Sequence, residues 1–335
     1  MAKIRVFTAE HHNPYFNLAT EDWLFRSTDP SEYVLFLWRN QKCIVIGRFQ
    51  NPWEECNLFA MDRDGVLLAR RQSGGGAVYH DLGNTNFTFM SPKQSYSKEE
   101  NFSIIVDALA KFGITAQTSG RNDIVVDNKK ISGSAFRLTS DRAFHHGTLL
   151  IDTELGSISE YLTPDKEKLQ SKGIKSVASR VANISSFNHE VTHERLCDSI
   201  IETFFAKYGV RCEIEELTFE RLSAEKELEA TYKQYADWKW RFGLTPEFSH
   251  IVKHRFAWGG ISLHLDVKDG VIKKGYVFSD ALDVAFIEQM QPLFAGHLYN
   301  GPLLARTIID SFSDSDEERK NMAAQVADFI TKELC

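Results

Sequence analysis

The chain has 335 residues, of which 43% are hydrophobic and 25% are charged, and its formal net charge is -7. These values are typical of a globular protein long enough for two domains, and the negative charge argues against nucleic-acid binding by bulk electrostatic attraction. The cysteines lack the spacing of a zinc site or a redox pair, so we expect free thiols in a reducing compartment, with the cytoplasm as the expected location.

The first part of the chain predicts short strands around one helix. Residues 1–10 contain no apolar run that would mark a signal peptide, and no run in the chain approaches membrane-spanning length. Asn13 and Pro14 are typical of the N-cap and first residue of a helix. We interpret residues 50–53 as a surface turn rather than a ligand contact. The expected strands are residues 4–7, 34–38 and 43–47.

The most informative stretch is residues 67–84, where an apolar run is followed by Arg70, Arg71, three glycines and a second apolar run. Three adjacent glycines permit positive φ angles and expose backbone N–H groups, which can form an anion-binding concavity. Guanidinium groups at its edge suit phosphate or carboxylate oxygens. The spacing matches neither a Walker loop nor a dinucleotide fingerprint. From the residues alone, a nucleotide-phosphate site and a simple hairpin with a glycine-rich turn both stay open.

Residues 97–151 predict a capped helix followed by strands. Ser97 and Glu100 form a capping-box pattern, and a turn at residues 120–123 precedes a strand. His145 and His146 are adjacent in an expected strand, so they should point to opposite faces and not form a metal pair.

Lys129 and Lys130 lead into a run of small residues at 131–135. Small side chains leave space beside the backbone, so a lysine there can project into a pocket. The alternative is a solvated hairpin turn. We favour the turn for Lys129 and leave both interpretations open for Lys130.

The remainder predicts a basic loop, a helix and a second domain. Residues 161–184 are rich in lysine and fit either a loop over an anionic ligand or a solvated surface. Residues 192–208 have helical periodicity, with Cys197 expected to pack in the core. A composition change near Leu244 divides the chain into domains at 1–245 and 250–335. The second domain is expected to have strands at 255–266 and 271–278 and helices from 286 to 334.

Several motifs together resemble the bacterial lipoate-protein ligase A family, within the larger biotin/lipoate protein ligase family. They are residues 17–21, 50–57, 70–84, 120–123, 130–135, 145–150 and 256–260. The resemblance implies an α+β fold: a large catalytic domain on a mixed, mostly antiparallel sheet, with a small α+β C-terminal accessory domain. It also implies a reaction in which ATP and lipoate, or octanoate, give lipoyl-AMP and pyrophosphate, after which a carrier lysine takes the lipoyl group.

The resemblance also assigns roles to single residues. It places Lys130 against both ATP and lipoate, and we expect this lysine to act electrostatically between the two reacting anions. Mg²⁺ is expected with ATP, with Asp123 either meeting the ion or capping the turn before its strand. The other expected ATP contacts are Arg71, Gly76, Ala77, Val78 and Tyr79.

The expected protein partners are apo lipoyl domains of 2-oxoacid dehydrogenase E2 subunits and the glycine-cleavage carrier protein, with no nucleic acid or membrane, and the enzyme is expected to be a monomer. An acidic carrier would need a local basic face, for which residues 235–241 and 161–184 are the candidates. Two other functions stay open. One is an ATP-independent lipoyl or octanoyl transferase with a cysteine nucleophile, and the other is a non-catalytic acyl-adenylate-binding module. Release of pyrophosphate from ATP distinguishes the ligase from the transferase.

Overall fold

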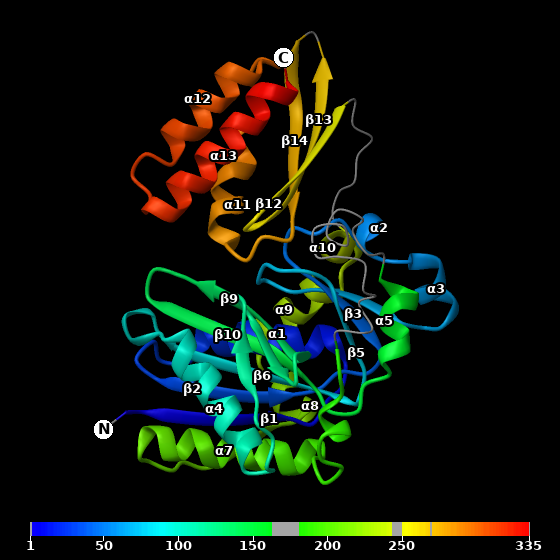
Figure 1. Ribbon diagram of the computed structural model, residues 1–335, viewed down its shortest axis with the longest axis vertical. Coiled ribbons are helices and arrows are strands. Elements are labelled where there is room, and N and C mark those ends of the chain that lie inside the picture. The colour runs from blue at the N-terminus through cyan, green and yellow to red at the C-terminus, as the bar shows by residue number, and fades with distance from the viewer. Residues whose placement is uncertain (1, 163–180, 243–249, 269, 335) are drawn as a thin grey trace. The chain divides into compact units, whose positions relative to one another are not determined.

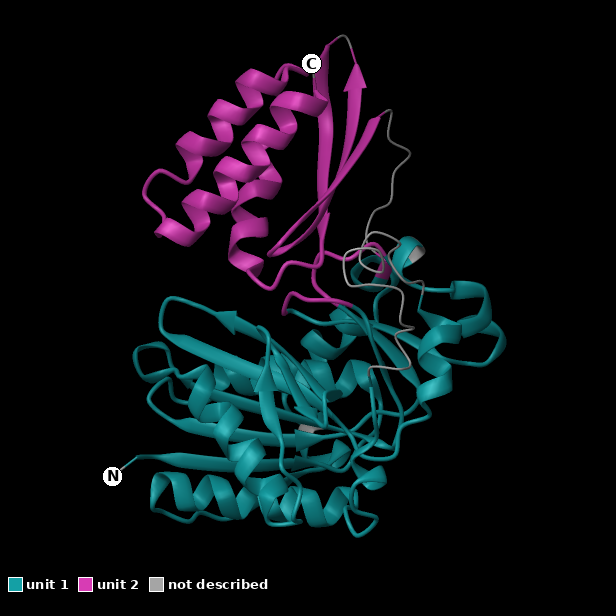
Figure 2. Cartoon of the chain, in the orientation of Figure 1, with its two compact units in different colours: residues 1–46, 52–72, 77–241 teal, residues 47–51, 73–76, 242–335 magenta. Residues whose placement is uncertain are grey.

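The computed structural model describes residues 2–162, 181–242, 250–268 and 270–334. The chain forms two compact units (Figure 2). Unit 1 comprises residues 1–46, 52–72 and 77–241, and unit 2 comprises residues 47–51, 73–76 and 242–335. Unit 2 therefore includes two short segments from the N-terminal half, and one of them contains the three glycines.

The helices and strands of the chain up to residue 242 are shown in Figure 1. They are β1 (Ile4–Ala9), α1 (Pro14–Ser27), β2 (Tyr33–Trp38), β3 (Cys43–Ile46), α2 (Pro52–Glu55), α3 (Leu58–Arg63), β4 (Leu67–Arg70), β5 (Val78–His80), β6 (Asn84–Pro92), η1 (Lys93–Ser95), α4 (Lys98–Ala110), β7 (Gln117–Ser119), β8 (Asp123–Val126), β9 (Lys129–Leu138), β10 (Arg142–Leu150), α5 (Leu155–Tyr161), η3 (Ile184–Ser186), α7 (His193–Tyr208), β11 (Ile214–Leu217), α8 (Phe219–Ser223), α9 (Lys226–Ala236) and α10 (Trp238–Phe242).

The main sheet of unit 1 has the strand order β11-β1-β2-β6-β10-β9-β8-β7 in the described residues. The pairs β11–β1 and β1–β2 are parallel, and the other five pairs are antiparallel. Helix α1 connects β1 to its parallel neighbour β2, as a parallel connection requires. The expected mixed, mostly antiparallel α+β fold is confirmed.

Each face of this sheet is covered by its own hydrophobic core. Helices α4 and α7 cover one face, where residues such as Phe89, Ile105 and Ile200 pack together. Helices α1 and α9 cover the other face, with Phe36, Phe144 and neighbouring apolar residues. Because both faces are covered, the central strands β2 and β6 are almost continuously buried.

A second, smaller sheet joins β4, β3 and β5 in that order. Strand β3 lies between the other two, parallel to β4 and antiparallel to β5. The interpretation of residues 67–84 as a simple hairpin is therefore wrong, since the strands before and after the glycines do not pair with each other. The glycine loop crosses over β3 instead.

The described C-terminal part of unit 2 packs three antiparallel strands against helices, the α+β arrangement that was expected. The strand order is β12-β13-β14, and the apolar face of the sheet packs on the helices. The elements are β12 (His250–Phe256), β13 (Gly259–Lys268), β14 (Val271–Ser279), α11 (Val284–Met290), η4 (Gln291–Leu293), α12 (Gly301–Ser311) and α13 (Glu317–Glu333).

Two local expectations were wrong. Residues 255–266 are not one strand, because Phe256 pairs with Gly259 and the chain reverses between them. The alternation of apolar and polar residues continues through this tight turn, so the hydrophobic pattern does not reveal it. Residues 50–53 are not a surface turn: Gln50 and Asn51 are buried, and Pro52 begins α2. The side-chain oxygen of Gln50 accepts a hydrogen bond from the Gly47 N–H at 2.9 Å, which holds the turn inward.

The expected caps are present. Asn13 Oδ1 accepts hydrogen bonds from the first turn of α1, and Ser97 Oγ accepts from the Glu100 N–H. Gly209 ends α7 in the left-handed conformation at φ 65°. In the described residues, no helix is both long and apolar enough to cross a membrane.

Candidate active site

Lys130 is the second residue of β9, and its side chain is 38% exposed. The turn before it consists of Asp127 and Asn128, both at positive φ, so Lys130 lies in the strand rather than in the hairpin turn. Its ammonium lies 2.7 Å from Asp123 Oδ1. Lys129 is exposed, as expected, but it is the first residue of β9 and not part of the turn, so the turn favoured for it is wrong. The structure thus brings together the predicted catalytic lysine and the predicted metal ligand, as an ion pair.

Arg71 follows β4 and is almost completely buried, with 5% exposure. Its Nη1 donates a hydrogen bond to the Val45 carbonyl at 2.9 Å, and Val45 pairs with Val78 of β5. Arg71 and Val78 are both predicted ATP contacts, and both are neighbours of Val45. Arg71 bonds to the Val45 carbonyl, and Val78 is the strand partner of Val45. Burial lowers the pKa of Arg71 to about 10, while the nearby Glu21 charge raises it, so the guanidinium stays charged at neutral pH.

Arg70 has a different role from its neighbour. Its guanidinium donates to the carbonyls of Trp240 and Arg241, each at 2.9 Å for the closest contact. The Trp240 indole N–H in turn donates to the Arg70 carbonyl. These bonds connect β4 to α10, so Arg70 anchors the two elements to each other.

The glycine segment, residues 73–76, packs within unit 2. The Gly75 N–H donates to the Ala281 carbonyl at 3.1 Å, and Gly75 has φ 89°. A Cβ on Gly74 would lie 2.1 Å from the same carbonyl oxygen. The glycines thus permit both a left-handed turn and a close backbone approach. Gly76, a predicted ATP contact, belongs to this segment.

Tyr79 and His80 are buried residues of β5, an edge strand of the small sheet. Burial raises the pKa of Tyr79 to about 12, and its ring stacks on Tyr161. Burial, with help from the positive charge of Arg71, lowers the pKa of His80 to about 3, so this imidazole is neutral. Its Nδ1 contacts the Asn40 amide at 3.1 Å.

A buried polar network was missed by the sequence analysis. Thr88 Oγ1 donates to Glu21 Oε1 at 2.6 Å, and His146 Nδ1 lies 2.8 Å from the same oxygen. His145 faces the opposite side of β10, surrounded by aromatic rings, so the expectation that the two histidines point apart is confirmed. In the sequence, the only local sign of this network was that Glu21 stands among the apolar residues of α1. Its partner His146 lies on β10, far along the chain.

A row of small and polar residues crosses the main sheet beside Lys130. Asp123 pairs with Gly133, and Asn86 pairs with Thr148 of β10. Thr148 Oγ1 lies 3.3 Å from the Gly133 N. Asn86 Nδ2 is buried without a hydrogen-bond partner in the described structure. A buried donor with no partner is costly, so this row is suited to receive a polar ligand group.

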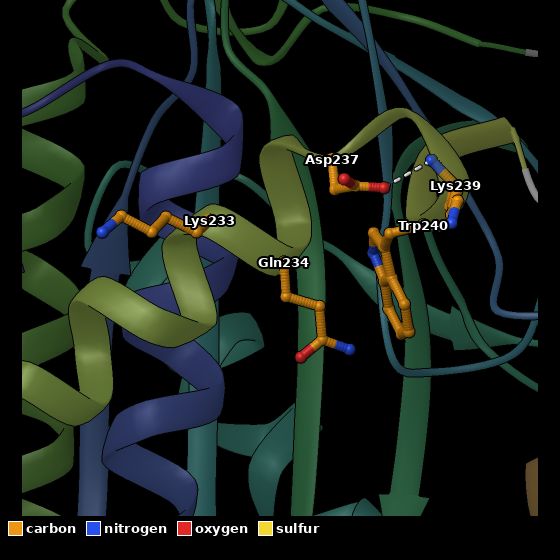
Figure 3. A pocket seen from close by; sticks show the side chains of 5 residues that line it. All are labelled: Lys233, Gln234, Asp237, Lys239 and Trp240. Carbon is orange, nitrogen blue, oxygen red and sulfur yellow. Dashed lines mark hydrogen bonds between the residues drawn. The ribbon is translucent and has the colours of Figure 1, made fainter.

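One surface hollow of about 500 Å³ lies on α9 and α10 (Figure 3). It is lined by Lys233, Gln234, Asp237, Lys239 and Trp240. Asp237 accepts a hydrogen bond from the Lys239 backbone N–H, and Lys233 pairs with Glu229. This surface therefore has mixed charge, and none of the residues expected to contact ATP or lipoate lines the hollow. The other candidate for a basic face was the stretch 161–184. Most of it, residues 163–180, lies outside the described residues.

Comparison with known families decides which protein class these features represent. Residues 13–205 match the lipoyl protein ligase A/B catalytic domain, and residues 245–329 match the bacterial lipoate protein ligase C-terminus. The chain belongs to the lipoate-protein ligase family. The resemblance read from the sequence motifs is confirmed.

Individual lipoate-protein ligases are similar over most of the chain. The "Lipoate-protein ligase A" of Psychrobacter cryohalolentis is 50% identical over 331 residues, covering 97% of this chain and 96% of that protein. The crystal structure of P. falciparum LipL1 in complex with lipoate is 36% identical with a TM-score of 0.86, covering 98% of this chain and 100% of that chain. A crystal structure of lipoate-protein ligase A bound with ATP is 26% identical with a TM-score of 0.61, covering 73% and 99%.

The cysteines of this lipoate-protein ligase are poor nucleophiles wherever the structure describes them. Cys43, Cys56 and Cys197 are buried, and burial raises the pKa of the Cys56 and Cys197 thiols to about 12. Cys212 is half-buried, and its pKa is also raised. The expectation that Cys197 packs in the core is confirmed. A thiolate nucleophile needs a lowered pKa, so the described cysteines do not suit a transferase.

Proposed function

We infer that this chain is an ATP-dependent ligase that activates lipoate as lipoyl-AMP and transfers the lipoyl group to a lysine of a carrier protein. Membership in the lipoate-protein ligase family over nearly the whole chain is the observation that carries this conclusion. The raised pKa values of the described cysteines support ATP-dependent activation over a covalent thioester route.

The first step joins two anions that repel each other. An oxygen of the lipoate carboxylate attacks the α-phosphorus of ATP, and the bond to pyrophosphate breaks. We propose that the Lys130 ammonium lies between the carboxylate and the α-phosphate and offsets this repulsion. A compact ammonium can contact oxygens of both groups, and its attraction is several-fold stronger away from water. The same charge stabilises the developing negative charge in the transition state.

Arg71 and the residues after it are proposed to hold the nucleotide. The buried Arg71 guanidinium is anchored on the Val45 carbonyl, which fixes its direction before ATP arrives. A preformed donor loses less conformational freedom on binding than a mobile side chain does. Gly76, Ala77, Val78 and Tyr79 remain proposed contacts along the nucleotide.

The second step transfers the lipoyl group. The neutral amine of a carrier lysine attacks the acyl carbon of lipoyl-AMP, the amine loses a proton, and AMP leaves. An acyl phosphate is a far better acyl donor than a carboxylate, which is why the first step consumes ATP. The lipoyl tail requires an apolar slot, and each buried methylene contributes roughly 0.8 kcal/mol, so octanoate should also bind.

Mg²⁺ is proposed to enter with ATP. In the described residues, no cluster of three or more histidine, cysteine, aspartate or glutamate side chains could hold a metal ion. Mg²⁺ is often held by only one or two carboxylates together with substrate phosphates, so this site fits an ion bound mainly by ATP. Such an ion would offset phosphate charge. Asp123 was predicted to contact this ion, but its carboxylate is already paired with the Lys130 ammonium, which would compete with Mg²⁺ for it.

The carriers, location and assembly state remain proposals. Lipoyl domains of 2-oxoacid dehydrogenase E2 subunits and of the glycine-cleavage carrier supply the lysine that the second step needs. Free, buried thiols are consistent with work in a reducing compartment such as the cytoplasm. We propose that the enzyme acts as a monomer.

A single assay tests the proposed function. Purified protein is incubated with ATP, Mg²⁺, lipoate and an apo lipoyl domain, and the carrier mass and pyrophosphate are measured. The ligase requires carrier lipoylation that depends on ATP and is accompanied by pyrophosphate. Transfer from an acyl donor without ATP would support the transferase instead, and the absence of any turnover would support a binding module.

A further inference from the structure

Asp123 and Lys130 form an ion pair that depends on an irregularity in strand β9. Asp123 begins β8, and Lys130 lies near the start of the neighbouring strand. The two atoms, Asp123 Oδ1 and Lys130 Nζ, are 2.7 Å apart. The sequence analysis assigned these residues to separate tasks, and nothing in the motif indicated that they touch.

A β-bulge places both side chains on the same face of the sheet. Asp123 is opposite Gly133 and Ile124 is opposite Ser132, but Val125 is opposite Lys130, so Ile131 is an extra residue in β9. Side chains alternate along a strand, so residues 123 and 125 point to the same face of the sheet. Their cross-strand partners, Gly133 and Lys130, lie on that face too. Without the extra residue, the Lys130 side chain would point to the opposite face, into the core that contains Ile124 and Ile131.

Gly133 leaves the space that the ammonium occupies. A Cβ at this position would lie 2.8 Å from Lys130 Nζ and 3.0 Å from its Cε. The lysine side chain therefore lies over the backbone of Gly133 on its way to Asp123. The bulge, the glycine and the carboxylate together fix the position of an otherwise flexible side chain.

We propose that Asp123 is a positioning residue for Lys130. An ammonium has three donors, so one can bond to Asp123 while two remain for the lipoate carboxylate and the α-phosphate. Asp123 acts through Lys130 and does not touch the reacting atoms. This inference rests on the proposed function, and it gives Asp123 a role different from that of a metal ligand.

The direct test is Asp123→Asn, which keeps the shape and removes the charge. Asp127→Asn is the matched control, because Asp127 is exposed in the turn of the same hairpin and Asn suits its positive φ. We expect kcat for lipoyl-AMP formation to fall about 10- to 100-fold in Asp123→Asn, with little change in KM for MgATP and no change in the control. Melting curves monitored by circular dichroism verify that both variants fold.

Two results would overturn the proposal. One is an Asp123→Asn rate equal to that of the wild type. The other is a rate restored by excess Mg²⁺ together with weaker Mn²⁺ binding, measured by electron paramagnetic resonance, which would make Asp123 a metal ligand.

Two further variants separate this inference from the proposed function. Gly133→Ala should displace the ammonium without changing any charge, and we expect it to lower kcat in the same direction. In a Lys130→Ala background, Asp123→Asn should have no further effect; an undiminished effect there would contradict action through Lys130. Full activity of Lys130→Ala alone would refute the proposed role of Lys130 itself, whatever Asp123→Asn does.

Discussion

Arg70 and Arg71 are neighbours in sequence but lie in different surroundings. Arg70 is bonded to the carbonyls of α10, whereas Arg71 is anchored on Val45, whose neighbouring strand β5 carries two predicted ATP contacts, Val78 and Tyr79. The residues alone placed both at the edge of an anion site, and the family resemblance assigned the ATP contact to Arg71. The surroundings of Arg70 are seen only in the structure, because the α10 carbonyls come from a distant part of the chain.

Replacing Arg71 by Lys tests its assigned role. The variant keeps a positive charge but loses the planar fork, so we expect KM for ATP to rise about tenfold, equivalent to about 1.4 kcal/mol. Arg70→Lys is the matched control and should lower stability by about 1.5–3 kcal/mol through lost hydrogen bonds while leaving KM for ATP unchanged. Steady-state kinetics and denaturant titration measure the two effects. An unchanged KM in Arg71→Lys would remove Arg71 from the nucleotide site.

The buried histidines make stability depend on pH. Burial lowers the pKa of His80 to about 3 and of His193 to about 4, and it places the pKa of His145 well below its usual value. Between pH 6.5 and about 4 the unfolded chain binds protons that the folded chain does not. Stability is therefore full above pH 6.5 and is lost as the pH falls, by up to about 1.4 kcal/mol per pH unit for each histidine.

His145→Leu isolates one of these contributions. Both ring nitrogens of His145 are buried among aromatic rings, without hydrogen-bond partners in the described structure. Replacing this side chain by an apolar one should therefore not lower the free energy of unfolding at pH 7, and we expect an increase of about 1 kcal/mol. We expect a flatter decline of the unfolding free energy between pH 6.5 and 4, measured by urea titration at several pH values. A slope equal to that of the wild type would show that His145 is not buried in neutral form.

At the scale of elements, local signals were reliable and long-range pairing was not. Caps at Asn13 and Ser97 were predicted because the bonds form within one turn of helix. The order β4-β3-β5 was not predicted, since it depends on β3 entering between two strands that flank the glycine loop. The Glu21–His146 contact was missed for the same reason, because its partners are 125 positions apart. The bulge at Ile131 has no signal in the hydrophobic pattern.

Two glycines at element ends should respond differently to alanine. Gly209 ends α7 at φ 65° with open space around its Cα, so Gly209→Ala should cost about 1–2 kcal/mol from backbone strain alone. Gly83 ends the turn before β6, and a Cβ there would lie 2.1 Å from the Asp152 carbonyl oxygen. Gly83→Ala should therefore be more destabilising than Gly209→Ala in denaturant titrations. A larger loss of stability in Gly209→Ala than in Gly83→Ala would show that the backbone near Asp152 can shift at little cost in free energy.

At the scale of the molecule, the glycine loop belongs to a unit that is built from both halves of the chain. Residues 73–76 belong to unit 2, where the Gly75 N–H bonds to the Ala281 carbonyl, and the Phe49 carbonyl accepts a bond from the Ser279 N–H. Phe49 also packs against the core of unit 2. The conformation of these short segments therefore depends on residues near position 280, although the motif that defines the loop is contiguous in sequence.

Ending the chain at Arg241 tests this dependence. Unit 1 has its own two cores, so the truncated protein should retain its secondary structure by circular dichroism. The freed loop must then be ordered by ATP itself, and fixing each residue costs about 1–2 kcal/mol, so we expect ATP affinity to fall tenfold or more in calorimetric titrations. Undiminished affinity in a folded truncated protein would show that the loop is preformed by unit 1 alone.

The measurement that bears most directly on the whole account is single-turnover formation of lipoyl-AMP by Lys130→Ala. Lys129→Ala serves as the control, since this neighbouring lysine is exposed. We predict a rate lower by on the order of 10²–10³ in Lys130→Ala and an unchanged rate in Lys129→Ala. Lipoyl-AMP formed by Lys130→Ala at the wild-type rate would contradict the account.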